Sequence, residues 1–163
     1  MNPFCQHGLG SCYRQSFDLA DVLRPELKTL CEEAKETASV CIREGDSHVC
    51  PYRTEPTRAI RHTIEEGANM PLERGASGKV LLAYSDDDFG EAVTIRKNGF
   101  ALSLGERDPE VAAVSVPVFA RSGRLVGALS LSGLITRFET AKQDDFANAL
   151  MQSSARLTKL ISS

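Results

Sequence analysis

A run of small residues suggests a site for a small anion. Residues 71–79 read Pro-Leu-Glu-Arg-Gly-Ala-Ser-Gly-Lys and precede the apolar stretch Val80–Tyr84, which predicts a loop followed by a helix. Backbone N–H groups at the positive end of a helix bind carboxylates and other anions. The alternative is a loop whose small residues serve only tight packing. A phosphate-binding P-loop is excluded because Glu73 and Val80 stand where that motif requires Gly and Ser or Thr.

The same run does not fit a catalytic nucleophile. In the nucleophile elbow G-x-S-x-G, a strand precedes the motif and glycine closes it. Here Lys79 takes the place of the closing glycine after Gly75 and Ser77, and no clear strand precedes it.

Two serines lie two residues apart on an apolar stretch near the C-terminus. On a strand, Ser130 and Ser132 share one face while Leu129 and Leu131 share the other. Buried hydroxyl groups need hydrogen-bond partners. The serines either bond to neighbouring backbone or present donors and acceptors to a pocket, and the strand alone leaves both possibilities open.

The cysteines and histidines form no recognisable metal or catalytic pattern. His48 and Cys50 share a strand face and His62 belongs to no pattern, so a metal site would need carboxylates supplied by the fold. No spacing selects a Cys–His nucleophile pair. We therefore predict no metal, no cofactor and no catalytic residue. The cysteines are odd in number and never form C-x-x-C, which favours scattered thiols in a reducing cytosol: Cys5, Cys12, Cys31, Cys41 and Cys50.

Composition limits the class of protein. The 163 residues suit one domain of roughly 100–200 residues. The net charge of −3 provides no excess of basic residues for binding nucleic acid. No apolar run approaches the ~18 residues of a membrane helix, and the N-terminus lacks a signal-peptide pattern. The acidic groups Asp86–Asp88 and Asp144–Asp145 suit the first turns of helices. We expect a cytoplasmic protein without membrane contact.

Periodicity predicts the elements that would position these residues. Apolar spacing predicts a helix, or two helices, over residues 18–36, broken or kinked around Pro25. Residues 37–43 and 47–53 read as a β-hairpin with a turn at Glu44-Gly45-Asp46. A third short strand is predicted near Thr57–Thr63.

The second half of the chain predicts a further helix, three strands and a closing helix. The helix covers Asp86–Asn98 and ends at Gly99, and Pro117 requires an edge or a bulge within its strand. Thr140 and Gln143 suggest a capping box. The strands are Gly99–Leu104, Val111–Ala120 and Arg124–Ser132, with a turn at Arg121-Ser122-Gly123, and the last helix places Phe146, Leu150, Ser153, Leu157 and Leu160 on one face. This order predicts an α+β domain with a mainly antiparallel sheet flanked by N- and C-terminal helices.

From about Leu9 to the C-terminus the chain resembles the effector-binding domain of IclR-type bacterial transcription regulators. The residues that carry the resemblance include the Gly-Lys-x-Leu-Leu-Ala run at Gly78–Ala83, the loop and strand at Gly105–Phe119, which ends in Pro-Val-Phe, and the strand Gly123–Gly133, which ends in Ser-Leu-Ser-Gly. The resemblance implies a GAF-like or profilin-like domain. It also implies that a small metabolite, often an oxo acid or an aromatic acid, changes the oligomeric assembly and the DNA affinity of a homodimer or homotetramer.

The resemblance also implies a set of effector-binding residues. The family's ligand loop matches Ala76 and Ser77 beside Gly75, an acidic position matches Glu106, and two serines match Ser130 and Ser132. The apolar wall of the pocket would come from Val114 and Val116. We predict that Glu106 accepts a ligand hydroxyl or orders water, and that neutral donors bind the acid because no arginine is clearly placed to do so.

Three departures from the family limit what the resemblance implies about the pocket. The segment Tyr84–Asn98 is shorter than in many members, which predicts an open or differently built wall. Glu73 and Glu110 stand where many members have His and Gly. The identity of the ligand does not carry over.

The resemblance places the effector-binding domain at residues 18–163 and makes residues 1–17 the end of an interdomain linker or a remnant of truncation. It implies that DNA contact requires an N-terminal winged helix-turn-helix that this chain lacks.

Two alternatives remain at this stage. Cys41 and Cys50 on adjacent predicted strands would suit a GAF-fold thiol reductase of a small sulfoxide, which requires a cysteine of low pKa in the pocket. A pure dimerisation module would bind no metabolite.

Overall fold

The domain is built on one six-stranded antiparallel sheet. The computed structural model describes residues 9–57 and 69–162. The sheet has the strand order β3-β2-β1-β6-β5-β4, and all pairs are antiparallel. The strands are β1 (Thr37–Glu44), β2 (Ser47–Thr54), β3 (Met70–Pro71), β4 (Ala101–Leu104), β5 (Val111–Phe119) and β6 (Leu125–Leu134), and the helices are α1 (Leu9–Ala34), α2 (Ala76–Ala83), α3 (Ala92–Asn98), the 3-10 turn η2 (Ile135–Arg137) and α4 (Thr140–Leu160).

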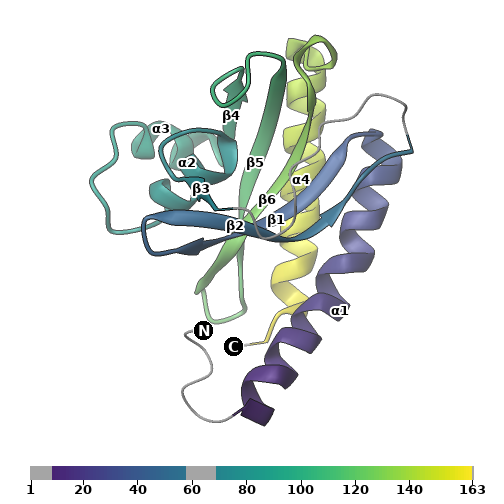
Figure 1. Cartoon of the computed structure of the whole chain (residues 1–163), viewed down its shortest axis with the longest axis vertical. Helices are drawn as coiled ribbons and strands as arrows, with labels where there is room; N and C mark the ends of the chain where they lie inside the picture. Colours follow the sequence, from purple (N-terminus) through teal and green to yellow (C-terminus); the bar gives the residue numbers. More distant parts are fainter. Residues whose placement is uncertain (1–8, 58–68, 163) are drawn as a thin grey trace.

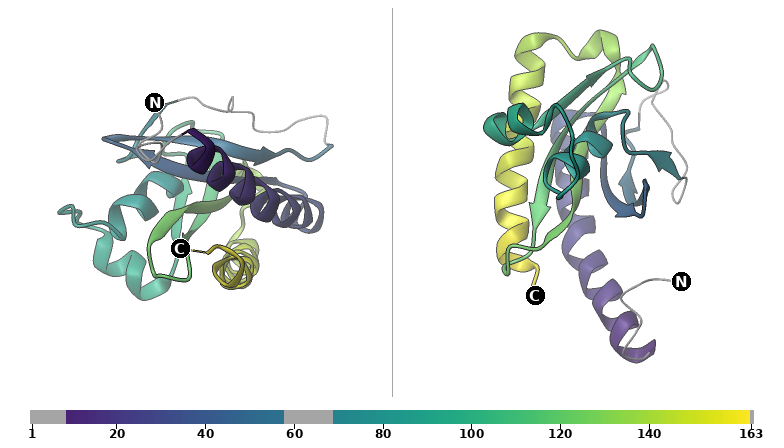
Figure 2. Two further views of the ribbon diagram at one scale, coloured as in Figure 1. Left: turned by 90° about the horizontal axis from the view of Figure 1, so that it is seen from below. Right: turned by 90° about the vertical axis from the view of Figure 1, so that its left-hand side faces the viewer.

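Helices cover both faces of the sheet, which confirms the predicted α+β class. The long helices α1 and α4 pack against one face around the larger core, and α2 and α3 pack on the other side around a smaller one (Figure 1). The first turns of α1 extend beyond the sheet (Figure 2). The predicted strand at Thr57–Thr63 falls almost wholly outside the described residues.

Of the two possibilities that the sequence left open, one helix or two, the structure shows one unbroken helix. It begins at Leu9 rather than at residue 18, and it continues through Pro25. Proline inside a helix removes one hydrogen bond and costs about 3 kcal/mol. Leu23 and Leu27, on either side of Pro25, are completely buried, and each contributes roughly 1.5–3 kcal/mol by leaving water. Burial of the apolar face therefore outweighs the local penalty.

The first hairpin is confirmed, and it contains a feature that the sequence did not predict. Gly45 adopts a φ of 63° in the turn between β1 and β2. The pairing of Val40 with Tyr52 and of Ile42 with Val49 leaves one extra residue on β2 between these pairs. This β-bulge includes Pro51, whose missing N–H costs least where ladder pairing is interrupted.

The central strands β5 and β6 are buried on both faces along most of their length. Pro117 pairs with Ala128 on β6, but β4 ends before reaching it, and a register shift follows at Val118 and Phe119. Pro117 thus lies beside an unpaired edge of β5 and next to a bulge, the two places where a strand tolerates the missing N–H of proline. The carbonyl of Pro117 accepts a hydrogen bond from Ser154 Oγ at 2.6 Å.

The last helix is confirmed, but its end and its cap differ from the prediction. Leu160 is 56% exposed, and the buried residue at this end is Ile161. The residue before the helix is Glu139, which makes no capping hydrogen bond with its side chain. The Gln143 side-chain amide instead donates to the Phe138 carbonyl at 2.7 Å, so Thr140 and Gln143 form no capping box.

The short helices begin at other residues than predicted. Helix α2 begins at Ala76 rather than at Val80, and α3 begins at Ala92 rather than at Asp86. Gly99 caps α3 in the left-handed conformation, as predicted. The acidic groups do not occupy first turns of helices: Asp86–Asp88 precede α3, and Asp144–Asp145 lie beyond the first turn of α4.

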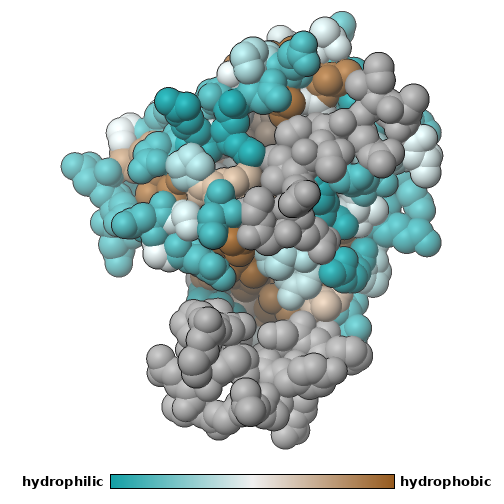
Figure 3. All heavy atoms as spheres, in the orientation of Figure 1, coloured by the Kyte–Doolittle hydropathy of each residue, from teal (hydrophilic) through white to brown (hydrophobic). Residues whose placement is uncertain are grey.

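Hydrophilic residues predominate on the face shown in Figure 3. Within the described part of the chain, no helix is both long enough and apolar enough to cross a membrane.

Candidate functional site

A polar cavity lies between the sheet and the start of α2. Its volume is about 360 Å³. Ligand pockets commonly measure about 300–1,000 Å³, so this cavity suits a small molecule. Its walls come from the sheet, the N-terminal end of α2 and the loop before β5: Ser39, Cys41, His48, Cys50, Arg53, Ser103, Ala113, Ser130 and Ser132 from the strands, Gly75, Ala76 and Ser77 from around the start of α2, and Arg107, Asp108, Val111 and Ala112 from the loop and the beginning of β5.

Strand register places four polar side chains in one row on the cavity side of the sheet. Ser39 on β1 lies opposite Arg53 on β2 and Ser130 on β6, and Ser130 lies opposite Ser115 on β5. Directly opposed residues of an antiparallel pair share one face of the sheet. These four side chains therefore form one row across four strands.

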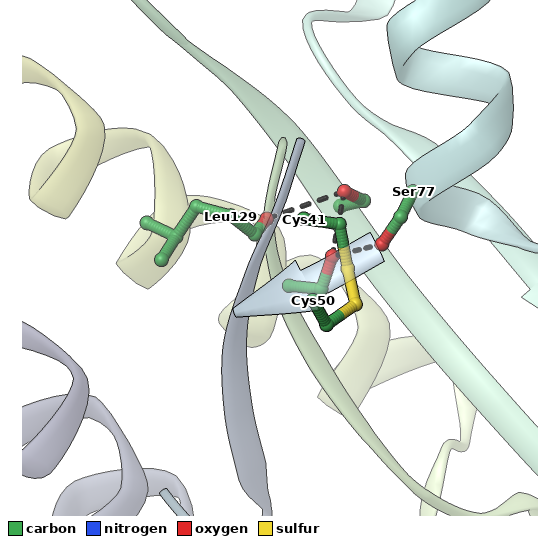
Figure 4. The surroundings of a disulfide bond; sticks show 6 residues. Cys41, Cys50, Ser77 and Leu129 are labelled. Atoms are coloured by element: carbon green, nitrogen blue, oxygen red, sulfur yellow. Dashed lines mark hydrogen bonds between the residues drawn. A yellow bond between two sulfur atoms is a disulfide. The ribbon is translucent and has the colours of Figure 1, made fainter. Parts of the chain in front are cut away.

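Three serine hydroxyls in this region form a hydrogen-bonded chain. Ser77 Oγ and Ser130 Oγ are 2.7 Å apart, Ser130 Oγ donates to Ser115 Oγ at 2.7 Å, and Ser115 Oγ donates to the Leu129 carbonyl at 3.3 Å (Figure 4). Ser130 is therefore satisfied by two serine hydroxyls rather than by neighbouring backbone, and it also lines the cavity. The contact between Ser77 and Ser130 joins α2 to the sheet.

The small-residue run forms the beginning of α2. Gly75 precedes the helix with a φ of 88°, and Ala76 and Ser77 belong to its first turn. The first amides of a helix have no partner within it and lie at its positive end. Gly78 lies away from the cavity and packs against the backbone of Leu72, which leaves no room for a side chain.

An ion pair between the buried Lys79 and the partly exposed Glu106 fixes this helix to the loop before β5. Lys79 Nζ contacts a carboxylate oxygen of Glu106 at 2.6 Å and donates to the Leu102 carbonyl at 2.8 Å. The Gly75 amide donates to the other carboxylate oxygen of Glu106 at 3.4 Å. Both Glu106 oxygens are therefore engaged by the protein. Glu106 does not line the cavity, contrary to the prediction that it would meet the ligand.

Two arginines reach the cavity, although the sequence suggested none. Arg53 faces it because the bulge on β2 changes which residues point to this side of the sheet. The Arg53 side chain also contacts Glu55 at 3.0 Å. Arg107 packs over Gly75, where a Cβ atom would come within 2.7 Å of the Arg107 Cδ atom.

Arg107 lines the cavity but is largely exposed to solvent. Among the described residues its guanidinium forms no hydrogen bond or ion pair. Partial desolvation, followed by the nearby Arg53, lowers its pKa, while Asp108 acts in the opposite direction. An arginine nevertheless keeps its charge at neutral pH. An anion entering the cavity would therefore find an unneutralised fork of N–H donors.

His48 has an unsatisfied nitrogen in the cavity wall. The residue is 1% exposed, and its Nδ1 atom has no hydrogen-bond partner among the described residues. Burial, with a smaller contribution from Arg107, lowers the pKa of His48 to about 4. The imidazole is therefore neutral at pH 7. The neutral ring carries one donor and one acceptor nitrogen.

The depressed pKa of His48 predicts a pH dependence of stability. The folded-state pKa of about 4 lies below the ordinary value of 6.5, so the unfolded chain binds a proton first as the pH falls. Stability should decrease between pH 6.5 and 4, by roughly 3 kcal/mol at full extent. Urea unfolding at pH 7 and pH 4.5 measures this loss. In a His48→Gln variant the loss should be smaller by the His48 contribution, and parallel pH profiles for both proteins would contradict this assignment.

Five of the eight predicted binding residues line the cavity: Gly75, Ala76, Ser77, Ser130 and Ser132. The prediction for Val114 and Val116 is wrong. Val114 lies opposite Leu131, and Val116 lies opposite Leu129, so both valines share the face that packs on α1 and α4. The apolar part of the cavity wall comes instead from Ala76 and from residues 111–113.

Cys41 and Cys50 form a disulfide between β1 and β2, contrary to the prediction of scattered thiols. Sequence spacing missed the pair because the hairpin, rather than a C-x-x-C motif, brings the two residues together. Cys31 is a free, buried thiol in the larger core, and burial raises its pKa. In the described segments no group of three His, Cys, Asp or Glu side chains could hold a metal ion. His62 lies outside these segments.

An antiparallel sheet with a polar cavity of this size beside a helix suits the binding of a small molecule. The family model described as "Bacterial transcriptional regulator IclR C-terminal" matches residues 12–93 and 89–159. The chain belongs to this family.

The two relatives described here are transcription regulators, not enzymes, which agrees with the prediction of no catalytic residue. The chain is 25% identical to the HTH-type transcriptional regulator BhcR of Paracoccus denitrificans, over 91% of this chain and 62% of that protein. It is also 25% identical to the DNA-binding transcriptional repressor YiaJ of Escherichia coli, over 88% and 61%. The chain thus spans about three fifths of the length of these relatives.

Solved structures show the same fold. The C-terminal domain of the Escherichia coli transcriptional regulator KdgR superimposes with a TM-score of 0.77 at 22% identity, covering 90% of this chain and 99% of that one. The IclR protein of Thermotoga maritima gives a TM-score of 0.79 at 21% identity, covering 96% and 75%.

Proposed function

We propose that this domain senses a small carboxylic acid, an oxo acid or an aromatic carboxylate, as the effector of an IclR-type transcription regulator. The acid would occupy the cavity between the sheet and α2. Its carboxylate would contact Arg107 and the first amides of α2. Ser130, Ser132 and His48 would bind the rest of the molecule through its oxygen atoms.

The observation that carries the proposal is the Arg107 guanidinium, which lines a cavity rich in hydroxyl groups and has no bonded partner among the described residues. An arginine without a partner can bind a carboxylate through two parallel, charge-assisted hydrogen bonds. Arg53 contacts Glu55, which leaves Arg107 as the cavity cation without an ion-pair partner among the described residues. A single cavity cation without such a partner favours an acid with one carboxylate over a ligand with several negative charges.

Binding of the acid at this site would affect DNA only through the assembly of the whole regulator. We infer that the acid changes the assembly of a homodimer or homotetramer and thereby its affinity for DNA. DNA contact would require an N-terminal domain beyond residues 18–163, with residues 1–17 belonging to the linker. Such coupling requires two arrangements of the domains that bind the acid with different affinity. We expect the protein to act in the cytoplasm.

A thermal-shift screen tests the proposed site. Pyruvate, 2-oxoglutarate, lactate, benzoate and 4-hydroxybenzoate are added to the parent chain and to a variant carrying Ser130→Ala and Ser132→Ala. A ligand present at one hundred times its Kd contributes about 2.7 kcal/mol, which raises Tm by roughly 5–11 °C for a domain of this size. We expect this rise in the parent and its loss in the folded variant.

A Ser122→Ala variant is the matched control, because Ser122 lies in the exposed turn between β5 and β6, away from the cavity lining. It should respond to acid like the parent. If no acid raises the Tm of the parent, the acid-sensing proposal fails and a module for dimerisation alone becomes the better reading. Equal shifts in the parent and the double variant would instead move the binding site away from the serines.

A further inference from the structure

A disulfide forms part of the wall of the cavity. Cys41 on β1 is 2% exposed and Cys50 on β2 is 5% exposed, both line the cavity, and Ser77 at the start of α2 lies near them (Figure 4). Met70 is the other buried hydrophobic residue of their small cluster. The proposed ligand would therefore lie directly against the sulfur atoms.

The disulfide joins the strands where their register shifts. The bulge lies between the pairs Val40–Tyr52 and Ile42–Val49, and Cys41 and Cys50 lie between those pairs. His48 precedes the bulge on β2 and Arg53 follows it, and both line the cavity. Because a bulge determines which way the following side chains point, the link between the cysteines helps to fix the positions of both polar residues.

We propose that Cys41 and Cys50 are a reversible thiol–disulfide switch that controls access to the acid-binding cavity, an inference that rests on the function proposed above. A thiolate of a dithiol reductant attacks one sulfur of the pair, and the other leaves as a thiolate and takes up a proton. The second thiol of the reductant then displaces the first cysteine, which is also protonated. The protein gains two electrons and two protons, and the dithiol becomes a cyclic disulfide.

Reduction changes the cavity because two thiols require more room than one disulfide. The two Cα atoms are 4.0 Å apart. Unbonded sulfur atoms must separate to van der Waals contact, so either a thiol turns into the cavity or the strands move apart at the bulge. The first change takes volume from the ligand, and the second displaces His48 and Arg53. Both weaken binding of the acid.

The coupling also acts in the reverse direction. Cytosolic disulfides are commonly transient and redox-sensing, so a reversible bond suits a transcription regulator of the cytosol. Because binding couplings are reciprocal, an acid that prefers the oxidised form must stabilise the disulfide. An acid in the cavity also covers the path by which a reductant reaches the buried sulfur atoms. Cys31 lies on the opposite face of the sheet, among the larger core, and takes no part in the exchange.

The test isolates the pair by replacing Cys5, Cys12 and Cys31 with serine in the full chain. The folded protein is equilibrated in glutathione buffers from fully reduced to fully oxidised, and its free thiols are alkylated and counted by intact mass. The His48 ring resonance is followed by NMR in the same samples. Binding of pyruvate, 2-oxoglutarate, benzoate and 4-hydroxybenzoate to the oxidised and reduced forms is then measured by calorimetry. A Cys41→Ser, Cys50→Ser variant, which cannot form the disulfide, serves as the open control.

We expect the two thiols to appear and disappear together, the His48 resonance to move with them, and the bound acid to have a Kd at least tenfold higher in the reduced form and in the open control. A pair that stays as two thiols in every buffer overturns the switch. Equal Kd values in the oxidised and reduced forms also overturn it. If no acid binds either form, the proposed function fails, and the switch is then decided by the thiol count and by whether the His48 resonance moves.

Discussion

Replacing Arg107 with alanine should weaken the binding of small carboxylic acids by roughly 10- to 100-fold. A hydrogen bond to a charged group contributes about 1.5–3 kcal/mol, and an arginine–carboxylate contact provides two such bonds in a fixed geometry. The loss should appear in Kd without a loss of folding. Because Arg107 is exposed, its replacement should change the stability of the fold by less than about 0.5 kcal/mol.

The measurement is calorimetric titration of the acid that gives the largest thermal shift, carried out with the parent, with Arg107→Ala and with Arg74→Ala. Arg74 is the matched control because it is exposed beside Gly75 but does not line the cavity. Its loss should leave Kd nearly unchanged. If Arg107→Ala binds the acid as tightly as the parent, the carboxylate lies elsewhere in the cavity, and the proposed role of the uncompensated guanidinium is wrong.

Replacing Leu129 with alanine should lower the stability of the fold by about 3 kcal/mol, because truncating a buried leucine costs 2–5 kcal/mol and leaves a cavity. Leu129 is completely buried on β6, and its cross-strand neighbours Val40 and Val116 belong to the same core. For a domain of this size, such a loss lowers Tm by roughly 6–12 °C. Urea unfolding and differential scanning calorimetry would both measure the change.

The comparison with the neighbouring residue separates stability from binding. Ser130 follows Leu129 but faces the cavity, so Ser130→Ala should reduce acid binding far more than Leu129→Ala does at a temperature where both variants are folded. Leu160→Ala is the control for leucine truncation, because this side chain is 56% exposed. It should change stability by less than about 0.5 kcal/mol. A Leu129→Ala variant as mild as Leu160→Ala would contradict the assigned core.

The sequence by itself determined the local elements and the two faces of the last strand. Gly45 and Gly99 mark a turn and a helix end that depend on backbone conformations favoured by glycine, and the structure places both as predicted. The alternation of Leu129, Ser130 and Leu131 follows from the two-residue period of a strand. These features depend on neighbours in the chain, which is why a single sequence reveals them.

The tertiary structure decided which residues meet in the cavity. Alternation along β5 places Val114 and Ser115 on opposite faces, but only pairing with Leu131 and Ser130 shows which of them lies on the cavity side of the sheet. The bulge on β2 turns Arg53 to the same side, and no composition signal near Pro51 gives its position. Register and bulges are set by contacts between strands, so they cannot be read from one segment.

The same reason explains the other differences from the prediction. Arg107 reaches the cavity because Gly75, far away in the chain, leaves room for its side chain, and Glu106 turns away because Lys79 on α2 binds it. Cys41 and Cys50 meet because the hairpin brings the two strands together. The residues with suitable chemistry were visible in the sequence. Their distances, burial and partners came from packing between segments that are remote along the chain.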